Sequence, residues 1–366
     1  MDYNITHLTS AHPRYDTRIF IKECATLAKV ENYRVHLVVA DGLGYEQKEG
    51  VTIFDVGIIK GRLKRILKTT KKILIQALEL KSDIYHIHDP ELIPIGLKLK
   101  KEGKIVIFDA HEDVPKQIMA KHYLNAFSKK ILSSLYAKYE IFALKKFDFV
   151  VGATPIIRDK FLSNGIQSQD INNFPILDEF IALEPKFDRD TICYIGLLYE
   201  SRGIEQLVRA IEDLDITLII AGKFYDIKYE EYIRSLKGWQ KVDFRGFVER
   251  DEVKEILNSS LAGVVTLHPT PSYKEAYPVK MFEYMSASIA VISSDFTLYK
   301  ELLGNSGICV DPLDITEIKE AIVTLCKNKK QTKLYGKNGR ERILQHYNWD
   351  IEAQKLLELY KEKRAL

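Results

Sequence analysis

Short apolar runs rich in β-branched residues recur through the first half of the chain, at residues 5–8, 35–39, 53–56, 84–88, 105–108 and 149–151. Amphipathic stretches separate most of them. After the first run, for example, Phe20, Cys24, Leu27 and Ala28 recur at helical spacing on one face. Strands that alternate with helices predict a parallel sheet covered by helices on both faces.

The second half repeats this pattern, with apolar runs at 191–195, 218–221, 242–244, 264–267, 290–292 and 308–310. The pattern breaks around Asn172-Asn-Phe-Pro, which predicts a linker, and residues 347–360 form a further amphipathic pattern. A chain of 366 residues exceeds what one hydrophobic core usually serves. We therefore expect an α/β chain with domains at residues 1–175 and 176–345 and a final helix at 346–366.

Composition narrows the class of protein. No apolar stretch approaches the roughly 20 residues of a membrane span, and the first residues do not read as a signal peptide, so a cytoplasmic protein is expected. A net charge of +3 is too small to predict nucleic-acid binding. The four cysteines, Cys24, Cys193, Cys309 and Cys326, show no metal-ligand spacing and are expected to be buried free thiols.

Ligands of parallel sheets bind beyond the carboxyl ends of the strands, so the loops that follow strands are the places to search. The first such loop carries His12, Arg14, Asp16 and Arg18. Asp16 has two open interpretations, a helix cap or a ligand contact. The forked donors of the two arginines would match an acceptor or a phosphate.

Two later predicted strands of the first half also run into polar sequence motifs. One motif is His88-Asp89-Pro-Glu-Leu, and the other is Asp109-Ala-His111-Glu-Asp. His86 and His88 alternate to one face of a strand, so a metal site with Asp89 is conceivable, but we predict none.

In the second half, the strand at 191–195 runs through Gly196 and a short loop to Arg202, just before a helix. This is a phosphate-binding arrangement, in which glycine permits close backbone approach and a basic side chain neutralises charge. The alternative for Arg202 is a simple surface charge. Lys223 follows another predicted strand and is a second candidate phosphate contact.

The stretch from Pro271 to Ala287 combines a loop that holds Glu275 with a helix that holds Lys280 and Glu283. We expect Pro278 at the first helical position, where free backbone N–H groups and Lys280 would favour a phosphate. Carboxylates beside a phosphate would bind sugar hydroxyls, which points to a nucleotide-sugar. The alternative is a solvated Glu275 and a Lys280–Glu283 pair on a helix surface.

Glu275 and Glu283, with seven residues between them, resemble the paired-glutamate motif of the retaining family-four glycosyltransferases, which have the two-domain GT-B fold. Together with the phrases at His88 and Asp109, the form Pro-x-Lys-x-x-Glu-Tyr-Met is similar to a branch of surface polysaccharide, capsule and O-antigen assembly. Two departures stand out: Ala-Tyr-Pro-Val-Lys replaces a Gly-Phe-Gly type loop, and Arg202 stands where lysine is usual.

The resemblance implies two GT-B domains of Rossmann type, with the last helix returning to the first domain, and no metal or other cofactor. It places the donor sugar at Glu275, the ribose at Glu283 and the nucleotide base at the backbone of Phe247 and Val248, which leaves UDP against GDP open. The implied catalytic residues are His111, Glu275, Arg202 and Lys280. The implied nucleotide-sugar contacts are Gly196, Arg202, Lys223, Phe247, Val248, Glu275, Val279, Lys280 and Glu283. The implied acceptor-side residues are His12, Arg14, Asp16, Arg18, His88 and Asp89.

Two segments of the first half mix basic and apolar residues and lack a balancing set of acids. Their basic residues are Lys60, Arg62, Lys64, Arg65, Lys68, Lys71 and Lys72 in the first, and Lys129, Lys130, Lys138, Lys145 and Lys146 in the second. Such a pattern suits an anionic membrane surface, and a solvated helix that packs on the sheet is the alternative.

The sequence therefore predicts a retaining glycosyltransferase that moves a sugar from a nucleotide donor to a glycan acceptor, lipid-linked at the inner membrane face. Two alternatives stay open: a nucleotide-sugar epimerase or hydrolase on a similar scaffold, and a non-catalytic membrane-associated glycan-binding subunit. The donor sugar, the linkage and the oligomeric state are not fixed by the sequence.

Overall fold

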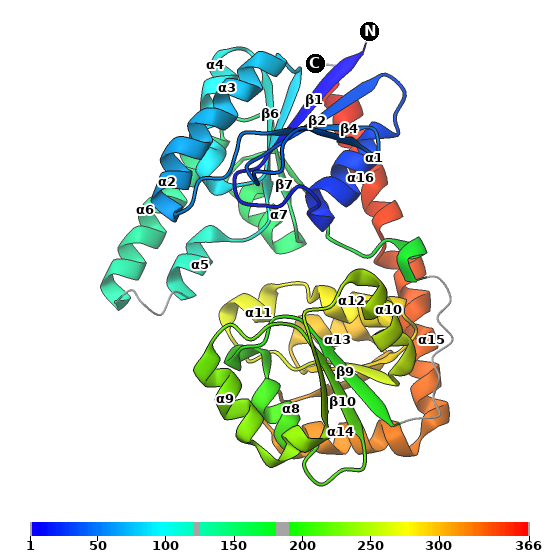
Figure 1. Cartoon of the computed structure of the whole chain (residues 1–366). Coiled ribbons are helices and arrows are strands. Elements are labelled where there is room, and N and C mark those ends of the chain that lie inside the picture. Colours follow the sequence, from blue (N-terminus) through cyan, green and yellow to red (C-terminus); the bar gives the residue numbers. More distant parts are fainter. Residues whose placement is uncertain (1, 121–124, 181–189, 365–366) are drawn as a thin grey trace. The chain divides into compact units, whose positions relative to one another are not determined.

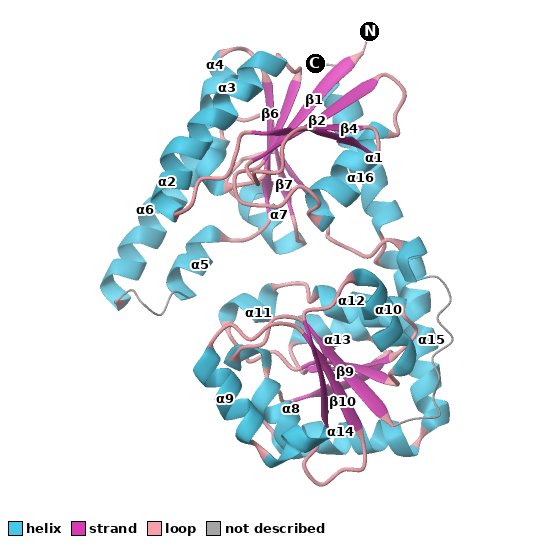
Figure 2. Cartoon of the chain, viewed as in Figure 1, coloured by secondary structure: helices cyan, strands magenta, loops and turns pink. Residues whose placement is uncertain are grey.

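A computed structural model describes residues 2–120, 125–180 and 190–364. The chain divides into two compact units, one of residues 1–173 and 352–366, the other of residues 174–351 (Figure 1). Each unit is an α/β layer structure with a sheet between helices (Figure 2). The predicted pair of parallel sheets is confirmed.

The sheet of the first unit is parallel except for one antiparallel edge strand, β3. Its spatial order is β3 (Glu46–Lys48), β4 (Val51–Asp55), β2 (Tyr33–Val39), β1 (Tyr3–Leu8), β5 (Ile84–Ile87), β6 (Ile105–Ala110), β7 (Phe149–Gly152) and β8 (Ser168–Asp170). The two short strands β3 and β8 were not predicted, because three residues give too little alternation for a pattern to register.

Helices cover both faces of this sheet (Figure 1). They are η1 (Thr17–Cys24), α1 (Ala25–Ala28), α2 (Arg62–Lys64), η2 (Arg65–Thr69), α3 (Thr70–Leu80), η3 (Pro90–Leu92), α4 (Ile93–Lys101), α5 (Val114–Ala120), α6 (Ala126–Leu144), α7 (Pro155–Leu162) and the end of α16 (Trp349–Arg364). Tyr360 of α16 is fully buried, and its hydroxyl lies 2.8 Å from Nδ1 of His86 in β5. The last helix thus returns to the first unit, as predicted.

The sheet of the second unit is parallel throughout, with the order β11 (Val242–Gly246), β10 (Thr217–Ala221), β9 (Thr191–Ile195), β12 (Ala262–Val265), β13 (Ala290–Ser294) and β14 (Gly307–Val310). The helical segments are η4 (Leu177–Phe180), η5 (Glu200–Arg202), α8 (Ile204–Ala210), α9 (Ile227–Ser235), η6 (Lys237–Lys241), α10 (Arg250–Ser259), α11 (Pro271–Glu275), α12 (Val279–Ser286), α13 (Thr297–Leu303), α14 (Ile315–Lys327) and α15 (Lys329–His346).

Helix α12 is fixed against the sheet by its buried aromatic and sulfur side chains. The Tyr284 ring lies over Gly263 of β12, where a Cβ atom would come within 2.3 Å of that ring. The Tyr284 hydroxyl accepts a hydrogen bond of 3.0 Å from the backbone N–H of Ile195. Pro278 occupies the N-cap and Val279 begins the helix, so the expected first helical position was wrong by one residue.

Two further expectations can be checked. The four cysteines are free, as predicted. The expected burial is confirmed for Cys24 and Cys193 and was wrong for Cys309 and Cys326, which are half-buried. Among the described residues, no helix combines the length and apolar character that crossing a membrane requires.

Candidate active site

The sheet of the second unit reverses its order between β9 and β12, because the chain leaves β9 toward β10 but leaves β12 toward β13. The loops that follow these two strands touch: the His268 N–H donates a 3.0 Å hydrogen bond to the Ser201 carbonyl. Such a reversal opens a crevice at the carboxyl ends of the strands, where ligands of this sheet type bind.

Glycines allow the strand-end loops to approach one another. Gly222 has φ +150°, and a Cβ atom there would lie 1.8 Å from the Gly196 carbonyl oxygen. Gly203 has φ +74°, and its Cβ would lie 2.1 Å from the Thr266 carbonyl oxygen. The N–H of Gly196 donates to the Ala221 carbonyl at 2.9 Å. Gly196 therefore shapes the loop, but its own N–H is already used within the sheet.

Arg202 is half-buried between two tyrosines at this strand end. Its guanidinium carbon lies 5.2 Å from the ring centre of Tyr199 and 5.1 Å from that of Tyr273, and Nε donates to the Tyr199 hydroxyl at 3.0 Å. Burial alone would lower the pKa of Arg202, but the tyrosine hydroxyls raise it. Arg202 forms no ion pair with a carboxylate of the described residues.

The tyrosines link the two predicted parts of the donor site. The hydroxyls of Tyr199 and Tyr273 lie 2.6 Å apart, and Tyr273 belongs to α11, the helix that ends at Glu275. Neither tyrosine was predicted as a site residue. Their only signal in the sequence is an aromatic residue close to Arg202 and another close to Glu275.

Lys223 and Phe247 meet at the ends of β10 and β11. The Lys223 ammonium lies 4.8 Å above the centre of the Phe247 ring, which is largely exposed. Val248 packs against the core of the unit, while Val279 is exposed at the start of α12. The structure thus brings Lys223, the predicted phosphate contact, next to Phe247, a predicted contact of the nucleotide base.

Glu283 is buried in α12, with only 7% of its surface exposed. Its Oε2 accepts from the Lys280 ammonium at 2.6 Å and its Oε1 from the Arg250 guanidinium at 3.0 Å. Burial raises the pKa of Glu283, but Lys280 and Arg250 outweigh it and hold the pKa below its usual value. Glu283 is therefore an ionised acceptor. Arg250, which also pairs with Glu179, was not predicted.

For the segment from Pro271 to Ala287, the alternative interpretation was a solvated Glu275 and a Lys280–Glu283 pair on a helix surface, and it is correct in part. Lys280 and Glu283 do pair one turn apart, but the pair is not a solvated surface feature, since Glu283 is buried. Glu275 ends α11 and is half-buried.

In the first unit, the loops after β1 and β5 are tied together by Asp89. One of its oxygens accepts from the Thr9 hydroxyl at 2.8 Å and from the backbone N–H groups of Ser10 and Ala11 at 2.5 and 3.2 Å. Its other oxygen lies 3.1 Å from Nδ1 of His12. Burial raises the pKa of Asp89, but these partners lower it far more. Asp89 thus organises the loop that carries His12.

The two predicted acceptor-side arginines are occupied by carboxylates of the chain itself. Arg14 makes two hydrogen bonds of 2.8 Å to Asp41 and a third of 2.8 Å to Glu46. Arg18 is buried, and its fork donates two bonds of 2.7 Å to Asp109. These pairs favour a structural role for both arginines.

Asp16 caps the helical segment η1. Its side chain accepts from the backbone N–H groups of Arg18 and Ile19 at 2.9 and 3.0 Å. Of the two interpretations left open for Asp16, the helix cap is therefore confirmed.

Asp109 lies between Arg18 and two imidazoles, that of His111 just after β6 and that of His88 just after β5. Its Oδ2 lies 3.0 Å from Nε2 of His111 and 3.2 Å from Nδ1 of His88. His111 is 21% exposed, whereas Asp109 and the His88 side chain are buried. The structure therefore joins His88 and His111, which the sequence places in separate loops.

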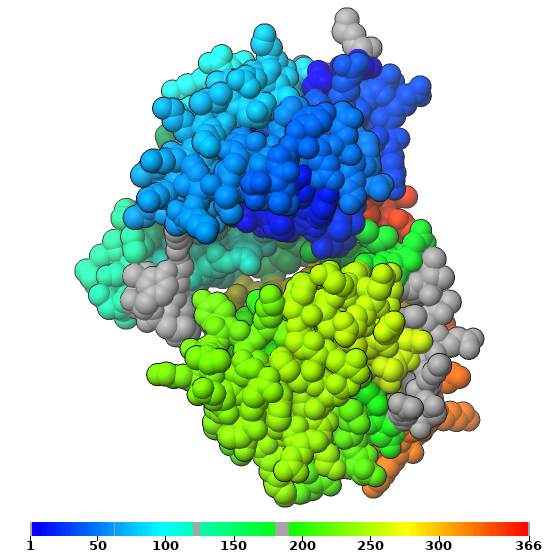
Figure 3. Space-filling view, viewed as in Figure 1, coloured from blue at the N-terminus to red at the C-terminus, as the bar shows by residue number. Residues whose placement is uncertain are grey.

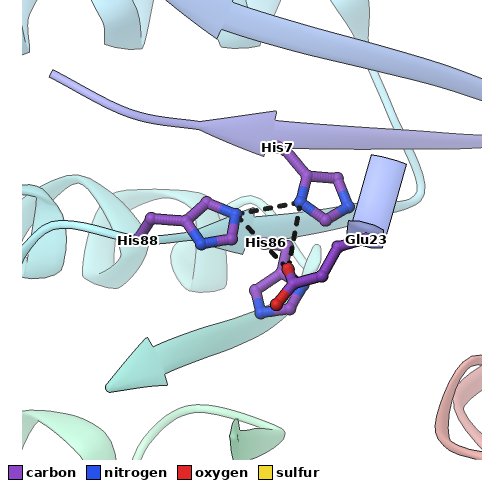
Figure 4. Close-up of side chains that lie close together, drawn as sticks. All are labelled: His7, Glu23, His86 and His88. Carbon is purple, nitrogen blue, oxygen red and sulfur yellow. Dashed lines mark hydrogen bonds and ion pairs between the residues drawn. The ribbon is translucent and has the colours of Figure 1, made fainter. Parts of the chain in front are cut away.

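Beneath these loops, His7, Glu23, His86 and His88 point toward one another (Figure 4). One possible metal-ligand atom from each residue lies within 4.8 Å of the others, which is close enough for the four residues to share a bound cation. Nδ1 of His7 and Nε2 of His88, however, are 2.9 Å apart and share one proton as a hydrogen bond. A cation would need the lone pairs of both atoms, so the donor set fits a hydrogen-bonded cluster better than a metal site.

Residues 178–342, nearly the whole second unit, match the family model described as glycosyl transferases group 1. Among curated proteins, the chain is 24% identical to an uncharacterized glycosyltransferase of Methanocaldococcus jannaschii, over 72% of this chain and 69% of that protein. It is 23% identical to the alpha-galactosylglucosyldiacylglycerol synthase of Streptococcus pneumoniae, over 83% of this chain and 84% of that protein.

Solved structures resemble the chain over nearly its full length. A sucrose-phosphate synthase from Thermosynechococcus elongatus aligns with a TM-score of 0.79 and 18% identity, covering 99% of both chains. The Anabaena protein HepE, in complex with UDP and glucose, aligns with a TM-score of 0.73 and 12% identity, covering 98% of this chain and all of HepE. These likenesses show that the two units have the GT-B fold.

Proposed function

We propose that this chain, a group 1 glycosyltransferase by its second unit and a GT-B protein by its fold, transfers a sugar with retention from a nucleoside-diphosphate sugar to a glycan acceptor. The acceptor is lipid-linked, and the reaction takes place on the cytoplasmic side in the assembly of a cell-surface polysaccharide. The relatives named above include a lipid glycosyltransferase, which supports this class of acceptor.

Two observations in the second unit carry the proposal: the cation Arg202 has no ion-pair partner among the described carboxylates, and the ionised Glu283 is buried. Arg202 is a half-buried cation with no ion-pair partner among the described carboxylates, so it suits the diphosphate. Glu283 is ionised, and each of its oxygens has one cationic partner and a lone pair left for a ribose hydroxyl.

The remaining roles follow from position. Lys223 and Phe247 would hold the nucleotide from the neighbouring strand ends, and Glu275 would bind the transferred sugar. Stabilising the departing diphosphate is the largest electrostatic contribution that such a site can make, and Arg202 and Lys280 would supply it. No step is assigned to a metal.

The first test is a calorimetric titration with UDP, GDP and other nucleoside diphosphates. One diphosphate should bind selectively, and Glu283→Ala and Arg202→Ala should each weaken it by roughly tenfold or more. Arg209→Ala is the matched control, because Arg209 lies in the same unit but pairs with Glu205 on the surface. Binding to none of the diphosphates would refute the donor site.

Product analysis separates the proposal from its enzymatic alternatives. A transferase forms a new glycosidic bond only when an acceptor is present, and NMR of the product should show the anomeric configuration of the donor. Glu275→Gln should lower the transfer rate far more than nucleotide affinity. An epimerase or hydrolase would act on the donor without an acceptor.

The surface of the first unit supports the lipid-linked acceptor. Helix α6, in teal, lies at the surface (Figure 3) and exposes Phe127, Leu135 and Phe142 at spacings of about two turns. The Lys146 ammonium lies 4.1 Å from the Phe142 ring. Leu63 and Leu67 are also exposed, one turn apart in the other basic segment. Apolar side chains flanked by lysines suit an anionic lipid surface.

Cosedimentation with vesicles tests this surface. Binding should be stronger to vesicles with anionic lipid than to neutral ones, and the double variant Leu135→Ser, Phe142→Ser should lose most of it. Leu334→Ser is the control, because Leu334 is a half-exposed apolar residue of α15 in the second unit. Equal binding to both kinds of vesicle would rule out the membrane role and leave the donor site untouched.

A further inference from the structure

The segment 268–275, which ends in helix α11 (Figure 1), is attached to the loop after β9 at two points. At its start, the His268 N–H donates a hydrogen bond of 3.0 Å to the Ser201 carbonyl. Near its end, the Tyr273 hydroxyl lies 2.6 Å from the hydroxyl of Tyr199. The first attachment uses backbone atoms alone, whereas the second exists only because both positions hold tyrosine.

Helix α11 depends on such attachments because it is short. It has 5 residues, beginning with Pro271, and it is capped by Thr270, which accepts from the N–H groups of Tyr273 and Lys274 at 3.2 and 3.1 Å. A single helical turn gains little stability from its own backbone, so its position is set by packing. Tyr273 supplies packing of this kind, since its ring lies against the core of the second unit while its hydroxyl reaches the loop after β9.

On the other side of the hydroxyl pair, Tyr199 holds Arg202 through both backbone and side chain. The Arg202 N–H donates to the Tyr199 carbonyl at 2.9 Å, and Nε of Arg202 donates to the Tyr199 hydroxyl at 3.0 Å. The guanidinium also faces the rings of Tyr199 and Tyr273 closely enough for cation–π attraction. A hydroxyl acceptor fixes the direction of the guanidinium without neutralising its charge, as a carboxylate would. The charge therefore stays available to an anionic ligand.

We propose that the hydroxyl pair of Tyr199 and Tyr273 is a clasp that couples the loop of Arg202 to α11. A diphosphate bound at Arg202 then also fixes the position of Glu275, because the row of hydrogen bonds from Arg202 through Tyr199 ends at Tyr273, in the same short helix. Both tyrosines are positioning residues. Every contact of the clasp lies within the second unit, and the assignment of a diphosphate to Arg202 and a sugar to Glu275 rests on the proposed function.

The two hydroxyls differ in what depends on them. Removing that of Tyr273 opens the clasp but leaves Arg202 with its acceptor, whereas removing that of Tyr199 takes away both. Tyr273→Phe should therefore lower kcat about tenfold and keep nucleoside diphosphate affinity within about twofold of wild type. Tyr199→Phe should lower kcat as much and also weaken the diphosphate about fivefold, as expected for one lost hydrogen bond. A residue that only supports the fold would not separate kcat from affinity in this way.

Tyr232→Phe is the matched control. Tyr232 lies in α9 of the same unit, and its hydroxyl also accepts from an arginine, with Nη2 of Arg209 at 2.9 Å. This variant should leave both kcat and diphosphate affinity unchanged. Equal values of kcat in Tyr273→Phe and Tyr232→Phe would overturn the proposal.

Hydrogen exchange tests the coupling without sugar transfer. Inorganic pyrophosphate is the probe, because it carries the charge of a diphosphate and has neither sugar nor base. In the wild-type protein, with labelling times from milliseconds upward, it should slow exchange both at residues 197–203 and at residues 272–276. In Tyr273→Phe it should slow exchange at residues 197–203 alone. Slowing at residues 272–276 that is absent in the wild type, or that persists in Tyr273→Phe, would refute the clasp.

These measurements separate the clasp from the proposed function. Coupled protection without sugar transfer would reject the proposed function and keep the clasp. Sugar transfer with uncoupled protection would reject the clasp and keep the function. If neither pyrophosphate nor any nucleoside diphosphate slows exchange at residues 197–203, both are wrong, since both require an anion at Arg202.

Discussion

The two units are built on parallel sheets with the same reversal of strand order, yet they treat the charges at their strand ends differently. In the first unit, Arg14 and Arg18 are both neutralised by carboxylates of the chain. In the second unit, Arg202 lies between tyrosines with no such partner among the described residues. A strand-end arginine is therefore a ligand candidate only where the fold leaves it without a carboxylate.

The two kinds of arginine should also differ in how much they contribute to the free energy of unfolding. The buried network of the first unit holds charges whose desolvation is offset only by their mutual pairing, so removing one member leaves another uncompensated. Arg202 pairs with tyrosines and with no carboxylate among the described residues, so its loss leaves no buried charge behind. The comparison predicts that Arg14 and Arg18 contribute to the stability of the first unit, whereas Arg202 contributes to the ligand affinity of the second unit.

The largest effect is expected for Arg18→Met. Asp109 would keep its charge inside the protein without its main partner, which should lower the free energy of unfolding by about 3–5 kcal/mol. Denaturant titration measures the loss. Arg245→Met, which breaks an exposed pair with Asp243, is the control and should cost less than about 0.5 kcal/mol. Equal effects of the two variants would break the comparison between a buried and an exposed ion pair.

Acid should act next most strongly, and on the first unit. Burial lowers the pKa of His88 to about 4, so the unfolded chain binds more protons than the folded one between that pH and 6.5. Stability from His88 is therefore lost as pH falls through this window, about 2 kcal/mol from pH 8 to pH 5. His7 and His86 have the same sign, while Glu23 and His12, whose pKa values are raised, offset part of the loss.

Hydrogen exchange locates this acid sensitivity. After correction for intrinsic rates, peptides of β1 and β5 should lose protection between pH 7 and pH 5 before peptides of β9 and β12 do. Uniform loss across both sheets would show that the histidine cluster does not govern the acid response.

A smaller change is expected for Arg202→Met. Stability should stay within about 1 kcal/mol of wild type, because no buried carboxylate loses its partner. Affinity for the nucleoside diphosphate should fall about tenfold, or 1.4 kcal/mol. Thermal unfolding with and without the diphosphate measures both quantities on one sample. A large loss of stability without ligand would place Arg202 with the structural arginines.

No measurable effect is expected from removing metal ions. Dialysis against a chelator should leave the transfer rate and the unfolding midpoint unchanged, because His7 and His88 already use their facing nitrogens in a hydrogen bond. Metal analysis of the purified protein, with a rate measurement after adding Mg²⁺ or Zn²⁺ back, checks this. Recovery of lost activity by either ion would contradict it.

Local patterns in the sequence predicted most of the fold. Buried parallel strands such as β9 and β13 appear as short apolar runs, because both faces of the sheet are covered. The return of the last helix was predicted from family resemblance, and the structure confirms it through Tyr360. The motif at His111 marked the end of β6 correctly, because polar residues after an apolar run are visible without tertiary information.

The sequence by itself determined two parallel sheets, the strand-end loops and the residue types available in them. Only the tertiary structure decided which charges meet. Arg18 and Asp109 are 91 positions apart, and Tyr360 lies 353 positions from His7. Residue spacing along the chain carries no signal for such pairs. The electrostatic role of each side chain depends on distance and burial in the folded protein, and both are set by the packing of whole elements.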